Sequence, residues 1–462
     1  MGVHDQKKRL LLINPANPVR SAVRNAFATQ YPPLGLAIIA ALTPGSWKIR
    51  LIDETFQPFR YREADLVGLT ALTGTIARAY EIARMYRDHN VPVVLGGIHA
   101  SMMPEEALKH ADAVVIGEAE TVWPEVLEDF KSGTLKRIYR GSYSDLSRQP
   151  IPRHDLFHPR YLFHGVQTTR GCPFDCDFCT VTAFNGKRFR LRPVEEVLDE
   201  LETIQGDNRS LIFVDDNLIG IGKNNQERAV LLFKGMVERK IKINWFTQTS
   251  VEIAENDEVL KWAAKSGCKM LYIGIESENP EALKSVNKAV NLKRGPKNYR
   301  RVFRKIHKHG IAVLGSFIFG LESDTRRDLL RRAWFTVFSN VDCYQANVLT
   351  PFPGTRLFDR MVEQERILRN GFPDEWSHYH AFDITFRHPL IPPVEFARTM
   401  TKAWRISYHP LVMLLGFFRT WINTRRLTPA LWAYSSNKAC REIVFEKKLS
   451  VWPETEVKKN LK

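Results

Sequence analysis

The stretch RGCPFDCDFC, residues 170–179, places three of the chain's six cysteines at the spacing C-x3-C-x2-C. These are Cys172, Cys176 and Cys179, and unrelated core cysteines rarely cluster so tightly. A structural zinc ion would need a fourth ligand, and no Cys or His pair follows at a finger-like distance. A disulfide would leave one thiol over. Three thiolates suit instead a four-iron four-sulfur cluster whose fourth iron has no protein ligand and stays open.

The same stretch resembles the signature of the radical S-adenosylmethionine (SAM) superfamily, with an aromatic residue, Phe178, before the last cysteine. The resemblance implies that Cys172, Cys176 and Cys179 bind the [4Fe-4S] cluster and are decisive for catalysis, with Phe178 beside the cofactors. It also implies that the open iron chelates the amine and carboxylate of SAM, which is cleaved reductively to a 5′-deoxyadenosyl radical. An external electron donor such as flavodoxin or ferredoxin is then expected.

The chain from residue 161 onward alternates short apolar runs with amphipathic segments, as βα units do. Six strands are expected near residues 165–169, 211–214, 244–247, 270–275, 312–319 and 344–349. They predict a partial or full parallel βα barrel of the TIM type, whose reactive end lies at the carboxyl ends of the strands. The three cysteines follow the first of these strands.

Polar or glycine residues end the later strands of this barrel. The segments FVDDN, WFTQTS, GIES and GSFIFGLE, which begin at residues 213, 245, 274 and 315, resemble those that surround SAM in the superfamily. The cofactor contacts that they predict are Asp216, Gln248, Glu276 and Gly320. An alternative for the acidic and hydroxyl side chains is that they cap the helices that follow.

The first third of the chain carries a second βα pattern, with apolar runs at residues 9–14, 48–53, 65–70, 92–97 and 112–117. It predicts a doubly wound, Rossmann-like sheet whose ligands bind at the carboxyl ends of the strands. Segments at residues 31–42, 95–101 and 116–120 resemble the cobalamin-binding class of the superfamily. Cobalamin is therefore an expected cofactor, and its predicted contacts are Thr70, Thr73, Gly96, Gly97 and Ser101.

One motif of some cobalamin domains is missing from the sequence. The pattern D-x-H-x-x-G, whose histidine is donated to cobalt, does not occur. We therefore predict cobalt without a histidine lower ligand, and we expect His99 to be a hydrogen-bonding residue of a βα turn. The glycines near it are also compatible with ordinary tight turns that bind no ligand.

These patterns divide the α/β chain into four expected regions: a cobalamin-binding-like domain (1–140), a linker (141–160), a radical SAM barrel (161–388) and a helical region (389–462). In the last region, residues 403–427 interleave Trp, Tyr and Phe with arginines. That composition is typical of an interfacial segment at an anionic membrane, or of a core helix whose arginines extend to the surface. Both interpretations remain open here.

The composition, with 462 residues of which 44% are hydrophobic and 26% charged, is typical of a globular protein. The N-terminus lacks the apolar segment of a secretory signal, and six cysteines are too few for a disulfide framework, so we expect a cytoplasmic enzyme. The net charge of +16 is compatible with contact at the inner face of the membrane. Nucleic acid is not favoured, because no RNP-type motif, zinc-finger spacing or long basic run occurs.

Together these features predict a radical SAM enzyme that binds a [4Fe-4S] cluster, SAM and cobalamin. As the resemblance implies, the expected activity is methyl transfer to an unactivated carbon of a small molecule, lipid-like, tetrapyrrole or another natural product. A cobalamin-dependent cyclase, oxidase or rearrangement enzyme is the second hypothesis. A non-catalytic basic protein that binds membranes or nucleic acid is the third.

Overall fold

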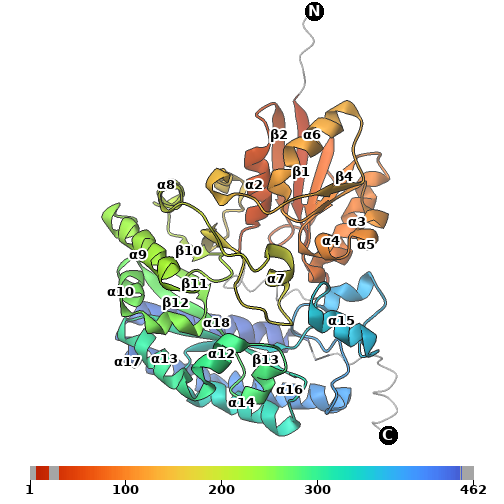
Figure 1. Ribbon diagram of the computed structural model, residues 1–462. Coiled ribbons are helices and arrows are strands. Elements are labelled where there is room, and N and C mark those ends of the chain that lie inside the picture. Colours follow the sequence, from red (N-terminus) through yellow and green to blue (C-terminus); the bar gives the residue numbers. More distant parts are fainter. Residues whose placement is uncertain (1–6, 20–30, 448, 450–462) are drawn as a thin grey trace, which may run out of the picture. The chain divides into compact units, whose positions relative to one another are not determined.

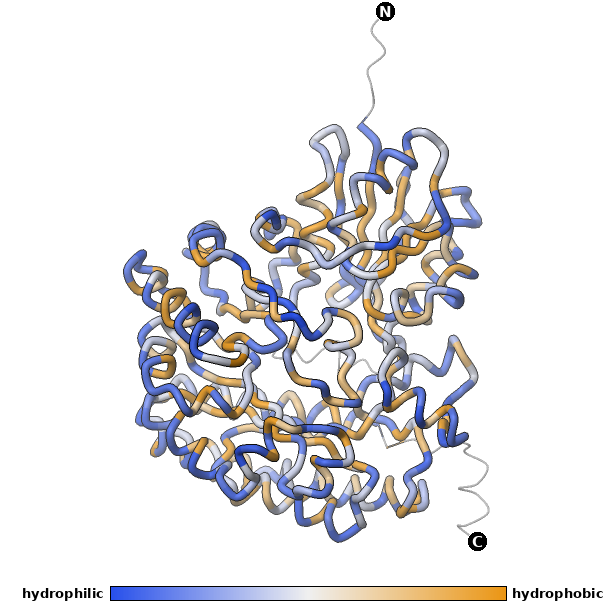
Figure 2. Tube along the Cα trace, in the orientation of Figure 1, coloured by the Kyte–Doolittle hydropathy of each residue, from blue (hydrophilic) through white to orange (hydrophobic). Residues whose placement is uncertain are grey.

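The computed structural model describes residues 7–19, 31–447 and 449 of the chain, and these form two compact units (Figure 1). Unit 1 consists of the described residues among 1–25, 32–161 and 371–377. Unit 2 consists of those among 26–31, 162–370 and 378–462. Each unit contains one six-stranded sheet, and Figure 2 shows hydrophobic segments in both units.

Unit 1 is a parallel sheet with helices between its strands. Its strand order is β2-β1-β3-β4-β5-β6, and every neighbouring pair is parallel. The strands are β1 (Lys8–Asn14), β2 (Trp47–Asp53), β3 (Leu66–Thr70), β4 (Val93–Gly96), β5 (Ala113–Ile116) and β6 (Ile138–Arg140). The helices are α2 (Leu34–Leu42), α3 (Ile76–Arg87), α4 (Ile98–Met102), α5 (Pro104–His110) and α6 (Trp123–Ser132). The predicted doubly wound sheet is confirmed, and β6 is an additional strand.

The carboxyl ends of four strands of this sheet are partly accessible. Strands β1, β3, β4 and β5 have buried centres, because both sheet faces are covered, yet each ends on a half-buried residue. Those last residues are Asn14, Thr70, Gly96 and Ile116. The strand order also reverses at β1, with β2 on one side and β3 on the other. Open α/β sheets bind their ligands at such a switch point.

Unit 2 is an open parallel barrel. Its strand order is β14-β13-β12-β11-β10-β7, and no pairing joins β7 to β14 within the described residues, so the barrel is partial. The strands are β7 (Phe163–Val166), β10 (Ser210–Phe213), β11 (Trp245–Thr249), β12 (Cys268–Glu276), β13 (Ala312–Phe319) and β14 (Cys343–Val348). All six agree with the strands expected from the sequence. A short antiparallel pair, β8 (Thr169–Arg170) and β9 (Arg190–Leu191), flanks the cysteine segment.

Helices connect the strands of unit 2 and extend beyond the last of them. They are α7 (Thr180–Asn185), α8 (Val194–Ile204), α9 (Lys223–Glu238), α10 (Asp257–Lys265), α11 (Pro280–Lys284), α12 (Ala289–Arg294), α13 (Tyr299–Lys308), α14 (Arg326–Phe338), α15 (Arg356–Glu363), α16 (Pro393–Ser407), α17 (Pro410–Thr424) and α18 (Leu427–Glu446). The last three therefore belong to unit 2 and do not form a separate region. One physical reason is that both helices hydrogen-bond to the backbone at β14. Trp404 of α16 donates to the carbonyl oxygen of Ala346, and Asn437 of α18 bonds to the backbone of Tyr344 and of Asp342, the residue before the strand.

One face of the unit 2 sheet changes from apolar to polar along the strands. Successive side chains of a strand point to opposite faces, so residues two apart share a face. On β12 this face carries Met270 and then Tyr272, and on β13 it carries Leu314 and then Ser316. The apolar members pack with Ala433 of α18, whereas the polar members line a cavity nearer the carboxyl ends. Helix α18 thus closes the apolar end of this face.

Residues 141–160, which the sequence marked as a linker, are part of unit 1 in the structure. Leu146 and Phe157 are buried there. At the end of the segment the hydroxyl of Tyr161 donates to Asp53 over 2.5 Å. The proline- and serine-rich composition therefore marks irregular backbone here, and tertiary contacts attach that backbone to the first sheet.

Candidate functional site

The cysteine segment of unit 2 is held in place by the two aspartates that follow β10. Asp215 is fully buried and accepts hydrogen bonds from the backbone N–H groups of Thr168 and Thr169 at 2.6 and 2.7 Å. Burial raises the pKa of Asp215 to about 6, although these donors act in the opposite direction. Asp216 accepts from the backbone of Gly171 and from Asn185, one residue on each side of the cysteines. Asp216, which the sequence predicted as a cofactor contact, therefore connects both ends of the cysteine loop and also lines the cavity beside it.

Further contacts fix the middle of the loop. Arg356 of α15 forms ion pairs with Asp175 at 2.8 Å and with Asp177 at 2.7 Å, the two acidic residues beside Cys176. The side-chain amide of Asn287 donates to the backbone carbonyl of Asp175. The loop is thereby anchored on several sides, as a site that must hold a metal cluster in one geometry requires.

The three cysteines line one cavity of about 290 Å³. None is in a disulfide. Burial raises the pKa of all three thiols, to about 11 for Cys176 and Cys179. Thiolates bound to metal are deprotonated, so binding of iron would release these protons. Three convergent thiols without a fourth cysteine beside them fit a cluster that keeps one iron open.

Four buried side-chain oxygen atoms, in residues that line this cavity, have no hydrogen-bond partner among the described residues. They are Asn217 Oδ1, Thr249 Oγ1, Ser250 Oγ and Asn291 Oδ1. A buried polar atom without a partner costs about 1–3 kcal/mol. Four such atoms around one cavity indicate a polar ligand, and the ammonium, ribose and adenine groups of SAM carry suitable partners. The cavity therefore fits SAM beside the cluster.

A buried ion pair lies at the same cavity. Glu276, predicted from the end of β12, lies 2.8 Å from Lys288, and both line the wall. Glu276 has a backbone φ of 58° at an irregularity in the pairing of β12 with β13. Burial opposes the charge on Lys288, but Glu276 and the cysteines raise its pKa. Lys288 also lies 5.9 Å from the ring of Phe178, the aromatic residue of the cysteine motif.

Other cavity residues were not predicted. The hydroxyl of Tyr272 donates to Gln345 over 2.8 Å, and the amide of Asn347 donates to Ser316 over 3.2 Å. Tyr272, Ser316 and Asn347 line the cavity together with the predicted Gln248, whereas Gln345 is not among the lining residues. Each of the three lies on a different strand, β12, β13 or β14, with its side chain on the cavity face. The alternation of side chains along a strand could have predicted them, but only once the register of the strands was known. Nothing in the sequence marked Lys288.

The predicted contact Gly320 lies outside the residues that line this cavity. Its φ of 89° favours glycine, and a Cβ atom there would come within 2.2 Å of the ring of Phe396. The position requires glycine for the turn and for packing, whatever the ligand. Its contact with a cofactor stays a prediction.

In unit 1, the predicted residues gather at the carboxyl ends of β3 and β4. Ser101 Oγ donates to the backbone carbonyl of Gly97 and accepts from the backbone of Gly117, so it connects two turns. Thr73 is buried, and its hydroxyl lies 3.3 Å from His99 Nδ1. His99 is fully buried, with Nε2 3.3 Å from Glu106. The expectation that His99 is a hydrogen-bonding residue is confirmed.

The remaining residues of this edge fit a large ligand that lies against backbone. Thr70 and Gly96 are half-buried strand ends at the switch side of the sheet. A Cβ atom at Gly96 would meet nothing closer than Val115, at 3.8 Å, so the glycine leaves space that a side chain would fill. A corrinoid with amide and phosphate groups needs such an accessible edge with hydroxyl and backbone donors.

Replacement of Gly97 by alanine is expected to lower cobalamin retention. Its φ is 95°, and a Cβ atom would lie 2.7 Å from Thr70 Oγ1 and 2.9 Å from the carbonyl oxygen of Ala71, so the turn must shift. Corrinoid counted on the desalted, reconstituted protein should fall, while iron content stays at the parent level because the cysteines lie in unit 2. Gly133→Ala is the control, since φ is also positive there but nothing lies within 4 Å. Full retention by Gly97→Ala would contradict the placement.

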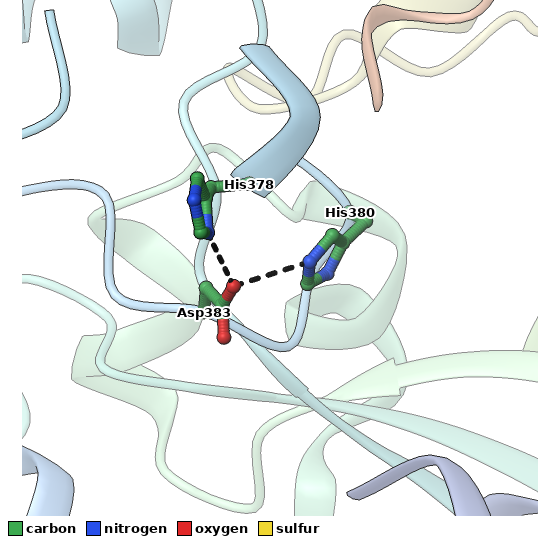
Figure 3. A group of neighbouring side chains, drawn as sticks. All are labelled: His378, His380 and Asp383. Carbon is green, nitrogen blue, oxygen red and sulfur yellow. Dashed lines mark hydrogen bonds and ion pairs between the residues drawn. The ribbon is translucent and has the colours of Figure 1, made fainter. Parts of the chain in front are cut away.

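A second group of potential metal ligands lies in unit 2, where His378, His380 and Asp383 converge (Figure 3). Asp383 Oδ2 lies 2.8 Å from His378 Nδ1 and 3.2 Å from His380 Nε2. However, the backbone N–H of Phe382 donates to His380 Nδ1, which places the proton of the neutral ring on Nε2. That atom then has no lone pair for a metal. The group instead stabilises a turn whose Ala381 lines the cavity and accepts a hydrogen bond from β14.

Comparisons with known proteins identify the family of each half of this architecture. The radical SAM superfamily matches residues 166–333, and the B12 binding domain matches residues 20–127. The chain is therefore a radical SAM enzyme with an N-terminal B12-binding domain. Its cofactors are a [4Fe-4S] cluster, SAM and cobalamin.

Individual relatives cover most of the chain. Bacteriochlorophyllide d C-12(1)-methyltransferase of Chlorobaculum tepidum is 29% identical over 452 residues, which are 92% of this chain and 95% of that protein. Hopanoid C-2 methylase of Rhodopseudomonas palustris is 27% identical over 354 residues, 73% and 66% of the two chains.

Solved structures share the fold. The radical SAM methyltransferase TsrM of Kitasatospora setae, with cobalamin and a [4Fe-4S] cluster bound, superposes with a TM-score of 0.68 at 16% identity, over 94% of this chain and 99% of that one. The cobalamin-dependent radical enzyme OxsB, with aqua-cobalamin and SAM bound, also gives 0.68 at 16% identity, over 96% and 72%.

Proposed function

We propose that this enzyme is a cobalamin-dependent methyltransferase that acts on an unactivated carbon of a poorly water-soluble small molecule, lipid-like or tetrapyrrole in class. The observation that carries the proposal is the cavity of unit 2, where three thiols meet residues that hold four unpartnered buried oxygens, in a chain that also has a B12-binding domain. Support for methyl transfer comes from relatives named as methyltransferases of bacteriochlorophyllide and hopanoid carbons. An external one-electron donor such as flavodoxin or ferredoxin completes the proposed system.

Several cavity residues have a proposed part in this function. When bound, the cluster supplies the electron that cleaves SAM, and cobalamin carries the methyl group. Cys172, Cys176 and Cys179 hold the cluster, and Asp216 keeps their loop in position. Asn217 and Ser250 offer hydrogen-bonding groups to SAM, Lys288 offers a cation to its carboxylate, and Glu276 neutralises that cation in the absence of the ligand.

The apolar part of the cavity wall is proposed to contact the substrate. Phe174, Ile318 and Phe352 contribute apolar wall, and Tyr272 and Asn347 contribute polar groups. Mostly apolar walls with a few fixed polar groups bind an oily molecule in one orientation. Radical chemistry also needs water to be excluded, which an apolar wall favours.

In unit 1, the hydroxyl of Thr70 and the backbone of Gly96 and Gly97 are proposed to contact cobalamin directly. Thr73 and Ser101 act through the turns, because their hydroxyl groups already bond to His99 and to Gly97 and Gly117. His99 is not proposed as a cobalt ligand, since its two ring nitrogens face Thr73 and Glu106.

The decisive experiment uses SAM with a deuterated methyl group. The enzyme, reconstituted without oxygen and supplied with a reductant, is incubated with a hopanoid or with a chlorophyllide-type tetrapyrrole. A product that carries the intact labelled methyl group supports the proposal. A product without the label, formed together with 5′-deoxyadenosine, would contradict it and favour a cyclase or oxidase.

A further inference from the structure

Helix α17 (Pro410–Thr424) presents its apolar side chains outward. Leu411, Leu414, Leu415, Phe418, Trp421 and Ile422 recur every three or four residues and are between 45 and 73% exposed. We name these six the α17 apolar face. A helix on the surface of a globular protein normally buries such a stripe. This one does the reverse.

The opposite side of α17 explains how the helix stays attached. It carries Met413, Gly416, Thr420 and Thr424, which are buried. Thr420 donates to Asp342 over 2.7 Å, and Thr424 donates to the carbonyl oxygen of Thr420. Apart from Met413, the inward residues are therefore small or hydroxyl-bearing, and the two threonine hydroxyl groups have their hydrogen bonds made. The outward apolar face is part of the folded arrangement, because turning it inward would break the hydrogen bond between Thr420 and the buried Asp342.

The neighbouring surface extends the same character. Arg419 donates to the backbone carbonyls of Val337 and Val341, so the end of α14 lies beside α17. There Trp334 and Phe338 stack at 5.7 Å and are 49 and 61% exposed. Exposed apolar side chains on two neighbouring helices are typical of an interaction site.

Charge identifies the occupant of this surface. Residues 396–441, which contain α17, include eight Lys or Arg and no Asp or Glu. Two of them, Arg425 and Arg426, are exposed directly after the helix. A second copy of the chain in a two-fold dimer would bring this cationic surface against itself, which like-charge repulsion disfavours. Aromatic and aliphatic side chains beside arginines are what an anionic lipid surface binds.

We infer that the α17 apolar face is a docking surface for an anionic lipid bilayer, with the helix in the interfacial plane. Its 15 residues span about 22 Å, and one side stays packed on the protein, so only the outward side chains enter the lipid. Within the described residues, no helix is long and apolar enough to cross a membrane. The inference is independent of the substrate, and docking would bring the enzyme to a source of water-insoluble molecules.

The test is vesicle flotation of the anaerobically reconstituted full-length enzyme. Vesicles of phosphatidylcholine alone are compared with vesicles that also contain phosphatidylglycerol, at low and high salt. The parent is expected to float with the anionic vesicles, less at high salt. The triple variant Leu415→Ser, Phe418→Ser, Ile422→Ser should lose at least about tenfold in partitioning, because three anchors are removed.

The matched control is the triple variant Leu231→Ser, Val237→Ser, Leu390→Ser, whose three residues are also exposed and apolar but lie outside α17. It should float like the parent, and both variants should cleave SAM like the parent, which separates docking from catalysis. Absence of flotation by the parent, equal flotation with neutral vesicles, or full flotation of the α17 variant would each overturn the inference. So would a dimer of the parent that the α17 substitutions dissociate without any vesicle binding, because the occupant would then be a second copy.

Discussion

Cys176→Ala is expected to abolish SAM cleavage and to remove the iron–sulfur absorbance of the reconstituted enzyme. The three cysteines line the same cavity and supply all the thiols there within the described residues. A cluster with three protein ligands cannot lose one and keep its open iron in place. Iron counting, the visible spectrum and the yield of 5′-deoxyadenosine measure the effect, and Cys172→Ala and Cys179→Ala should give the same result.

Cys268→Ala is the control for these variants. Cys268 is a fully buried cysteine of β12 in the core of unit 2, and it does not line the cavity. The substitution removes one sulfur from packing and should leave iron content and SAM cleavage close to the parent. If Cys176→Ala retained the cluster, or if Cys268→Ala lost it, the assignment of the ligands would be wrong.

Lys288→Met is expected to weaken both SAM binding and the folded state. It leaves Glu276, 5% exposed, without the cation that lies 2.8 Å away. Removal of one partner of a buried ion pair costs about 3–5 kcal/mol, because the remaining charge stays buried. Thermal unfolding measures the stability, and equilibrium binding of SAM to the cluster-loaded enzyme should show a loss of at least about tenfold, as for one charge-assisted hydrogen bond.

A double variant separates the two effects. Glu276→Gln combined with Lys288→Met removes both charges, so most of the stability should return, but SAM binding should stay weak. Lys284→Met is the matched control, because its ion pair with Glu281 is largely exposed and contributes about 0–1 kcal/mol. Parent-like SAM binding by Lys288→Met would show that this cation faces no ligand group.

Much of the site could be predicted because it is local in sequence. Cys172, Cys176 and Cys179 lie within eight residues, so their spacing alone indicates joint ligation. Asp216 and Glu276 each end an apolar run, and parallel strands bring such ends to one edge. The strand pattern also predicted both sheets, since buried parallel strands are continuous apolar runs.

Other features depend on contacts between distant segments. Lys288 pairs with Glu276 from the loop before α12, and Asn291, which lines the cavity, has a buried side-chain oxygen without a partner among the described residues while its amide donates to β12. No spacing rule connects such residues before the chain is folded. For the same reason the sequence could single out Gly320 as a cofactor contact, but only the structure shows that the ring of Phe396 occupies the space beside it.

The sequence by itself determined the class of chemistry, because the ligand spacing of a cluster and the apolar periods of βα units are encoded over short distances. Only the tertiary structure decided which side of α17 is covered. The sequence of that helix is apolar on one side and hydroxyl-bearing on the other, and local physics alone favours burial of the apolar side. Hydrogen bonds from Thr420 to Asp342 and from Arg419 to the end of α14 select the opposite orientation. Those partners lie about eighty residues away along the chain, beyond the reach of any local pattern.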